Sequence, residues 1–311
     1  MIQVEGLTKY YGERAAIRDL AFSIGKGEVV GFLGLNGAGK STTLKVLGCV
    51  LLPTSGRVRI DGFDVVESPH DIRRRIGYLP DTPPLYDEMT VGDYLAFVAR
   101  LRGVAKAQTA ARVQEAEERT ALTHVHAEPI RALSHGYRQR VGVAQALVHK
   151  PALLILDEPS SGLDPVQIVE MRALIRSLRG EHTVLVSSHI LAEISQTCDR
   201  LLVIQAGELV AQGTEAELAQ RSGSSGLVVV ELRGPVEKAQ AVLAGLEGVR
   251  GVRVESEQEG IVTLHVEASP ELRPVLARAL VLADLELLRL ERGTERLESI
   301  FLKLMHQKEA A

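Results

Sequence analysis

The sequence predicts an α/β domain followed by a smaller α+β domain. Two uniformly apolar runs, Leu153–Leu156 and Val184–Val186, are typical of strands in a parallel sheet that is covered on both faces. A third apolar run leads through a glycine-rich turn into a helical pattern, which is the order of elements in an α/β unit. The small, polar run 221–226 then separates two periodic regions, so we expect domains over residues 1–220 and 221–311.

Residues 2–33 alternate β-prone runs with turn residues, which predicts an antiparallel β subdomain that feeds a buried strand. These runs are Ile2–Gly6, Ala16–Ile24 and Val29–Leu33. Residues 90–149 carry helical patterns and little strand character, so we expect a helical insert in the α/β domain. The helical patterns cover Val91–Leu101, residues 105–120 and Tyr137–His149.

The region beyond residue 226 predicts a small ferredoxin-like sandwich with the element order βαββαβ. Its two helices are expected to open at Pro235 and Pro270, because proline is favoured in the first helical turn. Its strands are expected at Leu227–Leu232, Val249–Val254, Ile261–Val266 and Leu285–Leu290. A last helix is predicted by apolar residues at helical spacing, namely Leu297, Ile300, Phe301 and Leu304.

The composition is that of an ordinary folded protein. Of the 311 residues, 45% are hydrophobic and 24% are charged, and the net charge of −4 gives no overall attraction for nucleic acid. The two cysteines, Cys49 and Cys198, are expected to be free thiols in a reducing compartment. No uncharged run approaches the about 20 apolar residues of a membrane-spanning helix, and the start MIQVE lacks the features of a signal peptide. We therefore expect a cytosolic chain that does not itself cross a bilayer.

Residues 34–41 read Gly-Leu-Asn-Gly-Ala-Gly-Lys-Ser and match the pattern G-x-x-x-x-G-K-[ST] between a strand and a helix. The backbone N–H groups of such a loop surround a triphosphate, while Lys40 reaches the β and γ oxygens and Ser41 ligates Mg²⁺. A plain glycine turn before a helix is the alternative. The predicted nucleotide-binding residues here are Gly34, Leu35, Asn36, Gly37, Ala38, Gly39, Lys40, Ser41 and Thr42.

Two adjacent carboxylates, Asp157 and Glu158, follow the apolar strand Leu153–Leu156 at the end where ligands bind in open α/β sheets. Asp157 would hold Mg²⁺. Glu158 would polarise the water that attacks the γ-phosphate, because phosphoryl transfer needs a positioned nucleophile and charge stabilisation. Taken alone, an acidic pair after a strand is more often part of a solvated loop.

Three further segments accompany these motifs: Leu133–Arg140 (Leu-Ser-His-Gly-Tyr-Arg-Gln-Arg), Ser161–Asp164 and Ser187–His189. With them, residues 1 to about 220 resemble the nucleotide-binding subunit of ATP-binding cassette (ABC) transporters, whose motifs occur in this order. The Leu-Ser-x-Gly-x-x-Gln-Arg signature separates that family from other P-loop ATPases. The resemblance implies a P-loop NTPase cassette that hydrolyses ATP with Mg²⁺ as cofactor.

In this family two subunits pair head to tail, and each ATP lies between the P-loop of one subunit and the signature motif of the other. The resemblance therefore implies a homodimer in which Ser134, His135 and Gly136 form the signature site for the partner's nucleotide. The residues themselves also make Ser134 a natural N-cap for the predicted helix Tyr137–His149, whose N-terminus suits an anion. A plain helix cap is the alternative.

Three more positions match residues to which the family gives a role. His189 matches the switch histidine, which holds the γ-phosphate and orients the catalytic water; the alternative is a structural hydrogen bond. Tyr11 matches the aromatic residue that stacks on adenine, although packing at a strand end would also explain it. Asp164 matches an aspartate that couples the two sites, and Asp164-Pro165 is also an ordinary helix start. The implied catalytic residues are Lys40, Glu158 and His189.

Asp81 departs from the family, because most cassettes carry at this position a glutamine that touches Mg²⁺ and reports ATP to the membrane subunit. A carboxylate ligates Mg²⁺ directly or through water, but it cannot donate the hydrogen bond that an amide offers. We expect Asp81 to be a metal-side sensor beside Ser41 and Asp157. The alternative is that Asp81 caps the turn before Thr82.

Within the family, local features resemble the single-cassette subunits of ABC-2 type exporters. These features are Gly77-Tyr-Leu-Pro80 with the later Pro-Pro-Leu-Tyr, the Tyr-Arg-Gln-Arg continuation of the signature, and the C-terminal Leu-Glu-Ser-Ile-Phe-Leu-Lys-Leu. The resemblance implies a separately encoded integral membrane permease, a groove at residues 82–104 for its coupling helix, and a peripheral location on the cytoplasmic face of the cell membrane. It implies no nucleic-acid partner and leaves the cargo open.

The main alternative is a soluble ABC-family ATPase that acts on ribosomes or DNA. Such proteins usually fuse two cassettes or carry long coiled coils, whereas this chain has one signature motif and no sustained heptads. A P-loop kinase for a small molecule is a third hypothesis, and it leaves the signature motif unexplained.

Overall fold

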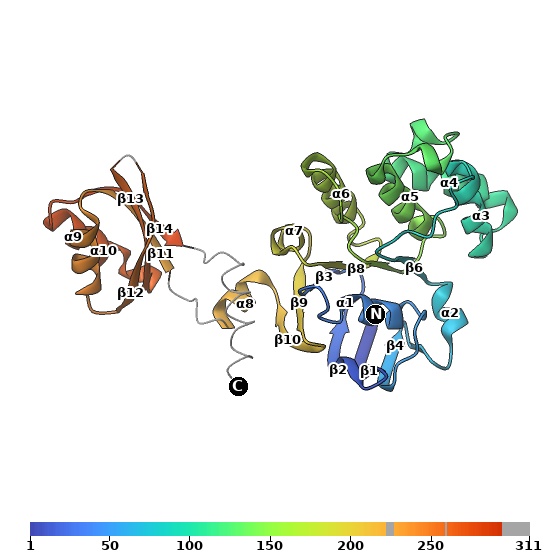
Figure 1. Ribbon diagram of the computed structural model, residues 1–311, viewed down its shortest axis with the longest axis horizontal. Coiled ribbons are helices and arrows are strands. Elements are labelled where there is room, and N and C mark those ends of the chain that lie inside the picture. Colours follow the sequence, from blue (N-terminus) through green and yellow to red (C-terminus); the bar gives the residue numbers. More distant parts are fainter. Residues whose placement is uncertain (222–226, 259, 294–311) are drawn as a thin grey trace. The chain divides into compact units, whose positions relative to one another are not determined.

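The computed structural model describes residues 1–221, 227–258 and 260–293. The chain divides into two compact units, of which the first is Met1–Thr214 and the second begins at Glu215 (Figure 1). The division of the structure falls just before helix α8 (Glu215–Arg221), which belongs to the second unit. The boundary predicted from the sequence, between residues 220 and 221, falls near the end of the same helix.

The first unit is built on a six-stranded sheet with the order β10-β9-β3-β8-β7-β6. All neighbouring strands are parallel except β10, which pairs antiparallel with β9. The strands are β3 (Val29–Leu33), β6 (Ile76–Leu79), β7 (Leu153–Leu156), β8 (Thr183–Ser188), β9 (Arg200–Gln205) and β10 (Glu208–Gly213). Every residue of β3, β7 and β8 is buried, so the prediction of a covered parallel sheet is confirmed.

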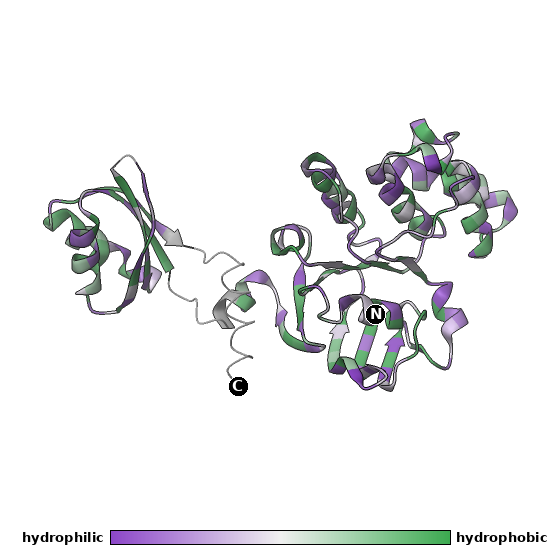
Figure 2. Cartoon of the chain, in the orientation of Figure 1, coloured by the Kyte–Doolittle hydropathy of each residue, from purple (hydrophilic) through white to green (hydrophobic). Residues whose placement is uncertain are grey.

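A second, antiparallel sheet has the order β2-β1-β4-β5. Its strands are β1 (Ile2–Tyr11), β2 (Arg14–Ile24), β4 (Ser55–Ile60) and β5 (Phe63–Asp64). Buried and exposed residues alternate in the second half of β2, from Leu20 to Ile24, and at the end of β4, from Val58 to Ile60. Figure 2 shows hydrophobic and hydrophilic residues interspersed along this sheet. The buried face packs with helix α1 (Lys40–Leu47) and the large sheet into one apolar core, in which the rings of Phe22 and Phe32 lie 6.1 Å apart.

The predicted helical insert lies between β6 and β7 and has an apolar core of its own. Its helices are α3 (Val91–Leu101), α4 (Lys106–Thr120) and α5 (His135–Leu147). Helix α5 begins two residues before the predicted start, because the Ser134 side chain caps it by accepting a hydrogen bond of 3.4 Å from the N–H of Tyr137. The remaining elements of this unit are α2 (Pro69–Arg73), η1 (Thr123–Val125), η2 (Ile130–Ala132), α6 (Pro165–Ser177) and α7 (Leu191–Ser195).

The second unit contains an antiparallel four-stranded sheet with the order β12-β13-β11-β14. The strands are β11 (Leu227–Arg233), β12 (Val249–Gln258), β13 (Ile261–Ala268) and β14 (Glu286–Gly293), joined by α9 (Val236–Ala244), η3 (Pro270–Leu272) and α10 (Arg273–Leu282). This element order and this strand order are those of the predicted ferredoxin-like sandwich. The helix predicted from Leu297 to Leu304 and the serine-glycine linker at 222–226 lie outside the described residues. In the parts of the chain that the structure describes, no helix is both long enough and apolar enough to span a bilayer.

A chain that ends at Arg221 should stay soluble and unfold in one cooperative transition. The reason is that the apolar core of the first unit and that of the second, which contains Val230, Leu264 and Leu280, share no residue. Calorimetry should place its midpoint within about 3 °C of the corresponding transition in the full chain, the shift expected for less than ~1 kcal/mol. An insoluble fragment would mean that the two units depend on a common core.

Candidate functional site

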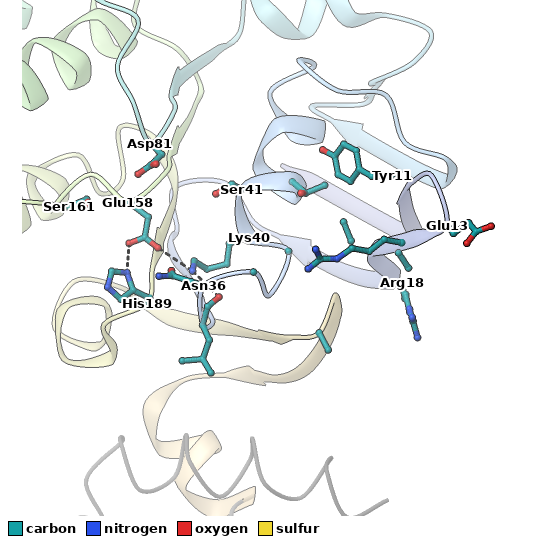
Figure 3. A pocket seen from close by; sticks show the side chains of 18 residues that line it. Tyr11, Glu13, Arg18, Asn36, Lys40, Ser41, Asp81, Glu158, Ser161 and His189 are labelled. Atoms are coloured by element: carbon teal, nitrogen blue, oxygen red, sulfur yellow. Dashed lines mark hydrogen bonds and ion pairs between the residues drawn. The ribbon is translucent and has the colours of Figure 1, made fainter.

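A cavity of about 980 Å³ lies at the carboxyl end of the parallel sheet (Figure 3). The segments that follow β3, β6, β7 and β8 all reach it, as expected for a ligand site in an open α/β sheet. The predicted site residues that line it are Tyr11, Leu35, Asn36, Gly37, Gly39, Lys40, Ser41, Thr42, Asp81, Glu158 and His189. The tertiary structure thus brings together residues from five separate parts of the sequence.

The glycine-rich loop owes its shape to close packing as well as to backbone freedom. Gly37 and Gly39 have positive φ angles of 80° and 105°. A Cβ atom on Gly34 would lie 2.5 Å from the carbonyl oxygen of Ile204 on β9, so a side chain would push the loop off the sheet. Gly34 and Ala38 are buried residues of this loop and do not line the cavity, so their part in nucleotide binding stays a prediction.

Lys40 is only 5% exposed and is held by three oxygen atoms. Its ammonium group donates hydrogen bonds to the carbonyl oxygens of Gly34 at 2.8 Å and Leu35 at 3.3 Å. The same nitrogen lies 3.2 Å from Oε1 of Glu158. A buried positive charge therefore faces the cavity from inside the loop, where a phosphate group would meet it.

Glu158 lies between Lys40 and His189, as Figure 3 shows. Its second carboxylate oxygen is 2.9 Å from Nδ1 of His189, and its side chain is 13% exposed. The backbone of Glu158 has a φ of 50°, which is uncommon for a residue with a side chain, and its N–H donates a hydrogen bond of 2.9 Å to Oγ of Ser187. The contacts on both sides of the residue hold this carboxylate at the edge of the cavity.

Asp157 is buried and accepts a hydrogen bond of 2.7 Å from Oγ of Ser187. Burial raises the pKa of the Asp157 carboxyl group, and hydrogen bonds from Ser187 and Ser41 oppose that rise. The neighbouring carboxylates of Asp81 and Glu158 raise it further. A hydroxyl and several carboxylates therefore gather close to the first turn of α1, and hard oxygen atoms of this kind are the ligands that Mg²⁺ prefers.

Asp81 is exposed and faces the cavity from the end of β6 (Figure 3). Within residues 1–221, 227–258 and 260–293, its side chain makes no hydrogen bond and no ion pair, so no contact supports the turn-capping alternative. Its carboxylate is close enough to Asp157 to influence the pKa of that residue. These observations are compatible with the metal-side position expected from the sequence.

The signature residues Ser134, His135 and Gly136 do not line this cavity. They lie at the start of α5, where Ser134 is the N-cap and Nε2 of His135 is 2.9 Å from the carbonyl oxygen of Ser161. Within one chain, the signature segment therefore lies outside the cavity that the glycine-rich loop lines. This separation is expected if each nucleotide site is formed by two copies of the chain.

The sequence did not point to several residues that line the cavity from β2 and its turn. Arg14 and Arg18 are the chemically important ones, because each adds a positive charge to the wall. Both arginines are exposed residues of β2, as charged side chains usually are. Which surface those side chains face depends on how the antiparallel sheet packs on the other one, and no local pattern contains this information.

Comparison with known proteins agrees with this geometry. A family model described as ABC transporter matches residues 17–161. An uncharacterized ABC transporter ATP-binding protein, YxlF, from Bacillus subtilis (strain 168) is 34% identical over 98% of this chain and 100% of its own length. The bacitracin transport ATP-binding protein BcrA of Bacillus licheniformis is 33% identical over 98% and 97%. The daunorubicin resistance ATP-binding protein DrrA3 of Streptomyces coeruleorubidus is 34% identical over 97% and 95%.

Solved structures resemble the first unit. An ATP-binding subunit of an ABC transporter superposes with a TM-score of 0.66 at 31% identity and covers 72% of this chain and 93% of that one. A dimeric post-hydrolysis ATP-binding cassette with bound ADP and Pi gives a TM-score of 0.63 at 26% identity over 69% and 98% of the two chains.

Asp157→Asn should stabilise the protein in the absence of metal and nucleotide. Because burial raises the pKa of Asp157, its ionised form is less favourable in the folded than in the unfolded chain, and a neutral amide avoids this cost while still accepting the Ser187 hydrogen bond. Calorimetry at pH 7 in EDTA should show a midpoint about 2 to 4 °C higher, which corresponds to ~1 kcal/mol.

The gain should shrink as the pH falls through the raised pKa of Asp157, because the wild-type carboxyl then becomes neutral as well. Asp81→Asn is the matched control, since Asp81 is exposed and should give no comparable shift. A midpoint lowered by Asp157→Asn would show that the ionised carboxylate stabilises the fold.

Proposed function

The chain belongs to the ABC transporter family, and from that premise we propose that it is the ATP-hydrolysing subunit of an ABC-2 type exporter. The observation that carries the proposal is the contact of Glu158 with both Lys40 and His189 beside the glycine-rich loop. This arrangement places a base, a phosphate-binding cation and a polar imidazole around one cavity. Such a set can position a water and neutralise developing charge, which is what ATP hydrolysis requires.

In this proposal the glycine-rich loop binds the phosphates. The N–H groups of the loop and the N-terminal end of α1 point to the β-phosphate, and Lys40 neutralises the β and γ oxygens. Tyr11, which is 50% exposed on the cavity wall, stacks on the adenine ring. Arg14 lies on the same wall and adds attraction for the triphosphate.

Mg²⁺ fits the oxygen atoms next to Lys40, because the Ser41 hydroxyl is close enough to the buried Asp157 carboxylate to lower its pKa, and Asp81 faces the same region. Ser41, Asp157 and Asp81 would hold the ion, which would supply charge neutralisation of the β and γ oxygens. The chain itself positions the nucleophile: Glu158 accepts a hydrogen bond from the attacking water, and His189 orients that water and contacts the γ-phosphate.

The active form in this proposal is a homodimer. Because the signature segment with Ser134, His135 and Gly136 lies outside the cavity of its own chain, a second copy would bring this segment to the nucleotide, with Ser134 and Gly136 as the contacting residues. The capped N-terminus of α5 offers free N–H groups to the γ-phosphate there. A related cassette with bound ADP and Pi is dimeric, which supports a dimer for this chain.

The transport role rests on the relatives, whose names state bacitracin transport and daunorubicin resistance. They favour an exporter over a soluble ATPase acting on ribosomes or DNA. We infer that a separately encoded membrane permease binds the groove at residues 82–104 and that the subunit works on the cytoplasmic face of the cell membrane. The second unit would then act on dimer geometry or regulation.

Glu158→Gln should leave ATP binding intact and lower the hydrolysis rate by about 10² to 10⁴-fold, because an amide keeps the shape of the side chain but is no base. Size-exclusion chromatography with Mg²⁺-ATP should then show a trapped dimer. The measurement is steady-state phosphate release together with nucleotide binding by the full chain.

Lys40→Ala is the contrasting variant, since it removes the cation from the phosphate site and should weaken ATP binding itself. The proposal would be wrong if Glu158→Gln hydrolysed ATP at nearly the wild-type rate. Unchanged nucleotide affinity in Lys40→Ala would count against the role of the glycine-rich loop.

Asp81→Ala should raise the Mg²⁺ concentration needed for half-maximal hydrolysis by about ten-fold, equivalent to ~1.4 kcal/mol, with little change in metal-free nucleotide affinity. Stimulation by the membrane partner should also fall. The measurement is a Mg²⁺ titration of ATP hydrolysis, with and without the partner.

Asp71→Ala is a suitable control, because Asp71 is another exposed carboxylate and lies outside both the cavity and the proposed permease groove. Wild-type behaviour of Asp81→Ala across the titration would favour the turn-capping interpretation.

A further inference from the structure

The first turn of α5 packs against the loop that joins β7 to α6 in the same chain. Nε2 of His135 lies 2.9 Å from the carbonyl oxygen of Ser161. A carbonyl oxygen only accepts hydrogen bonds, so the imidazole donates through Nε2–H. This contact joins two segments that lie 26 residues apart in the sequence.

The fit between the two segments is tight. A Cβ atom on Gly162, whose φ is 72°, would lie 2.9 Å from Nε2 of His135. A Cβ atom on Gly136 would lie 2.5 Å from Oε1 of Gln167 in the first turn of α6. Two glycines thus stand where the segments approach most closely, and His135 supplies the hydrogen bond between them.

The loop that His135 contacts is part of the nucleotide cavity. Ser161 lines that cavity on the same side as Glu158 (Figure 3). The N–H of Ser161 donates a hydrogen bond of 3.0 Å to the carbonyl oxygen of Glu158. Ser161 is therefore tied through its N–H to Glu158 and through its carbonyl group to His135.

We propose that His135 is a positioning residue that holds the Ser161–Gly162 loop in its own chain's nucleotide cavity. The proposal rests on the proposed function, in which the neighbouring Ser134 and Gly136 contact the nucleotide of the partner. The start of α5 then serves both sites of the dimer, one directly and the other through the loop.

The first test compares His135→Ala with His135→Gln in the full chain. The amide nitrogen of glutamine reaches about as far from the backbone as Nε2 of histidine and can donate the same hydrogen bond. We expect His135→Ala to lower kcat for ATP hydrolysis by about three- to ten-fold, with KM for ATP changed less than about two-fold. His135→Gln should recover most of kcat.

His124→Ala is the matched control, because the imidazole of His124 also contacts α5, at the hydroxyl of Tyr137, but does not touch the loop. It should leave kcat unchanged. If His135→Ala and His135→Gln are equally active, or if His135→Ala raises KM at constant kcat, the hydrogen bond does not position the loop and the proposal is overturned.

The second test separates the two sites in mixed dimers made from differently tagged copies. When one copy carries Glu158→Gln, only the cavity of the other copy hydrolyses ATP. We expect His135→Ala to lower hydrolysis by about three- to ten-fold when it sits in the copy with the intact Glu158, and to have less effect when it sits in the copy that carries Glu158→Gln. Loss only in the second placement would mean that His135 acts on the partner's nucleotide, which contradicts the proposal.

Hydrogen exchange decides the proposal even if the role of Glu158 proves wrong. The N–H groups of Ser161 and Leu163 are bonded within the loop, and they should exchange at least about ten-fold faster in His135→Ala than in the wild type or in His135→Gln. Unchanged exchange would overturn the positioning role. Rapid hydrolysis by the Glu158→Gln homodimer would instead contradict the proposed function alone.

Discussion

The parallel pairing of β3, β8, β7 and β6 is the constraint on which the site depends. Leu33 pairs with Ser188, Leu156 with Val186, and Leu79 with Leu156, so the strands end at nearly the same level. Each short apolar strand therefore delivers the polar residues that follow it to one edge of the sheet. A shift of register by one residue would turn buried side chains to the opposite face and separate these residues from each other.

At that edge, one hydroxyl group organises the two acidic residues. Oγ of Ser187 donates to the carboxylate of Asp157 and accepts from the N–H of Glu158. The bond to the N–H of Glu158 helps to hold the positive φ of that residue, a conformation that is unfavourable by itself and that points its carboxylate toward Lys40. A serine outside the recognised acidic pair thus contacts the carboxylate of Asp157 and the backbone of Glu158.

The site contains buried charged groups whose burial does not stabilise the ligand-free fold. Lys40 is nearly buried, and burial makes the ionised form of Asp157 less favourable than in water. Such groups weaken a ligand-free protein, but they bind a triphosphate and a metal with little reorganisation. The start of α5 likewise combines two roles, because Ser134 caps the helix while His135 contacts the loop of the cavity.

The sequence by itself determined the features that depend on neighbouring residues. Burial of β3 and β7, the helix caps at Ser134 and Asp164, and the glycine-rich turn before α1 all follow from local patterns of apolar, capping and glycine residues. Only the tertiary structure decided that Arg14 and Arg18 line the cavity, that Ser187 links Asp157 to Glu158, and that His135 contacts Ser161. These contacts join residues far apart in the chain, and they depend on strand order and on the packing of two sheets. Many weak interactions over the whole core set that packing, so no single segment of sequence carries it.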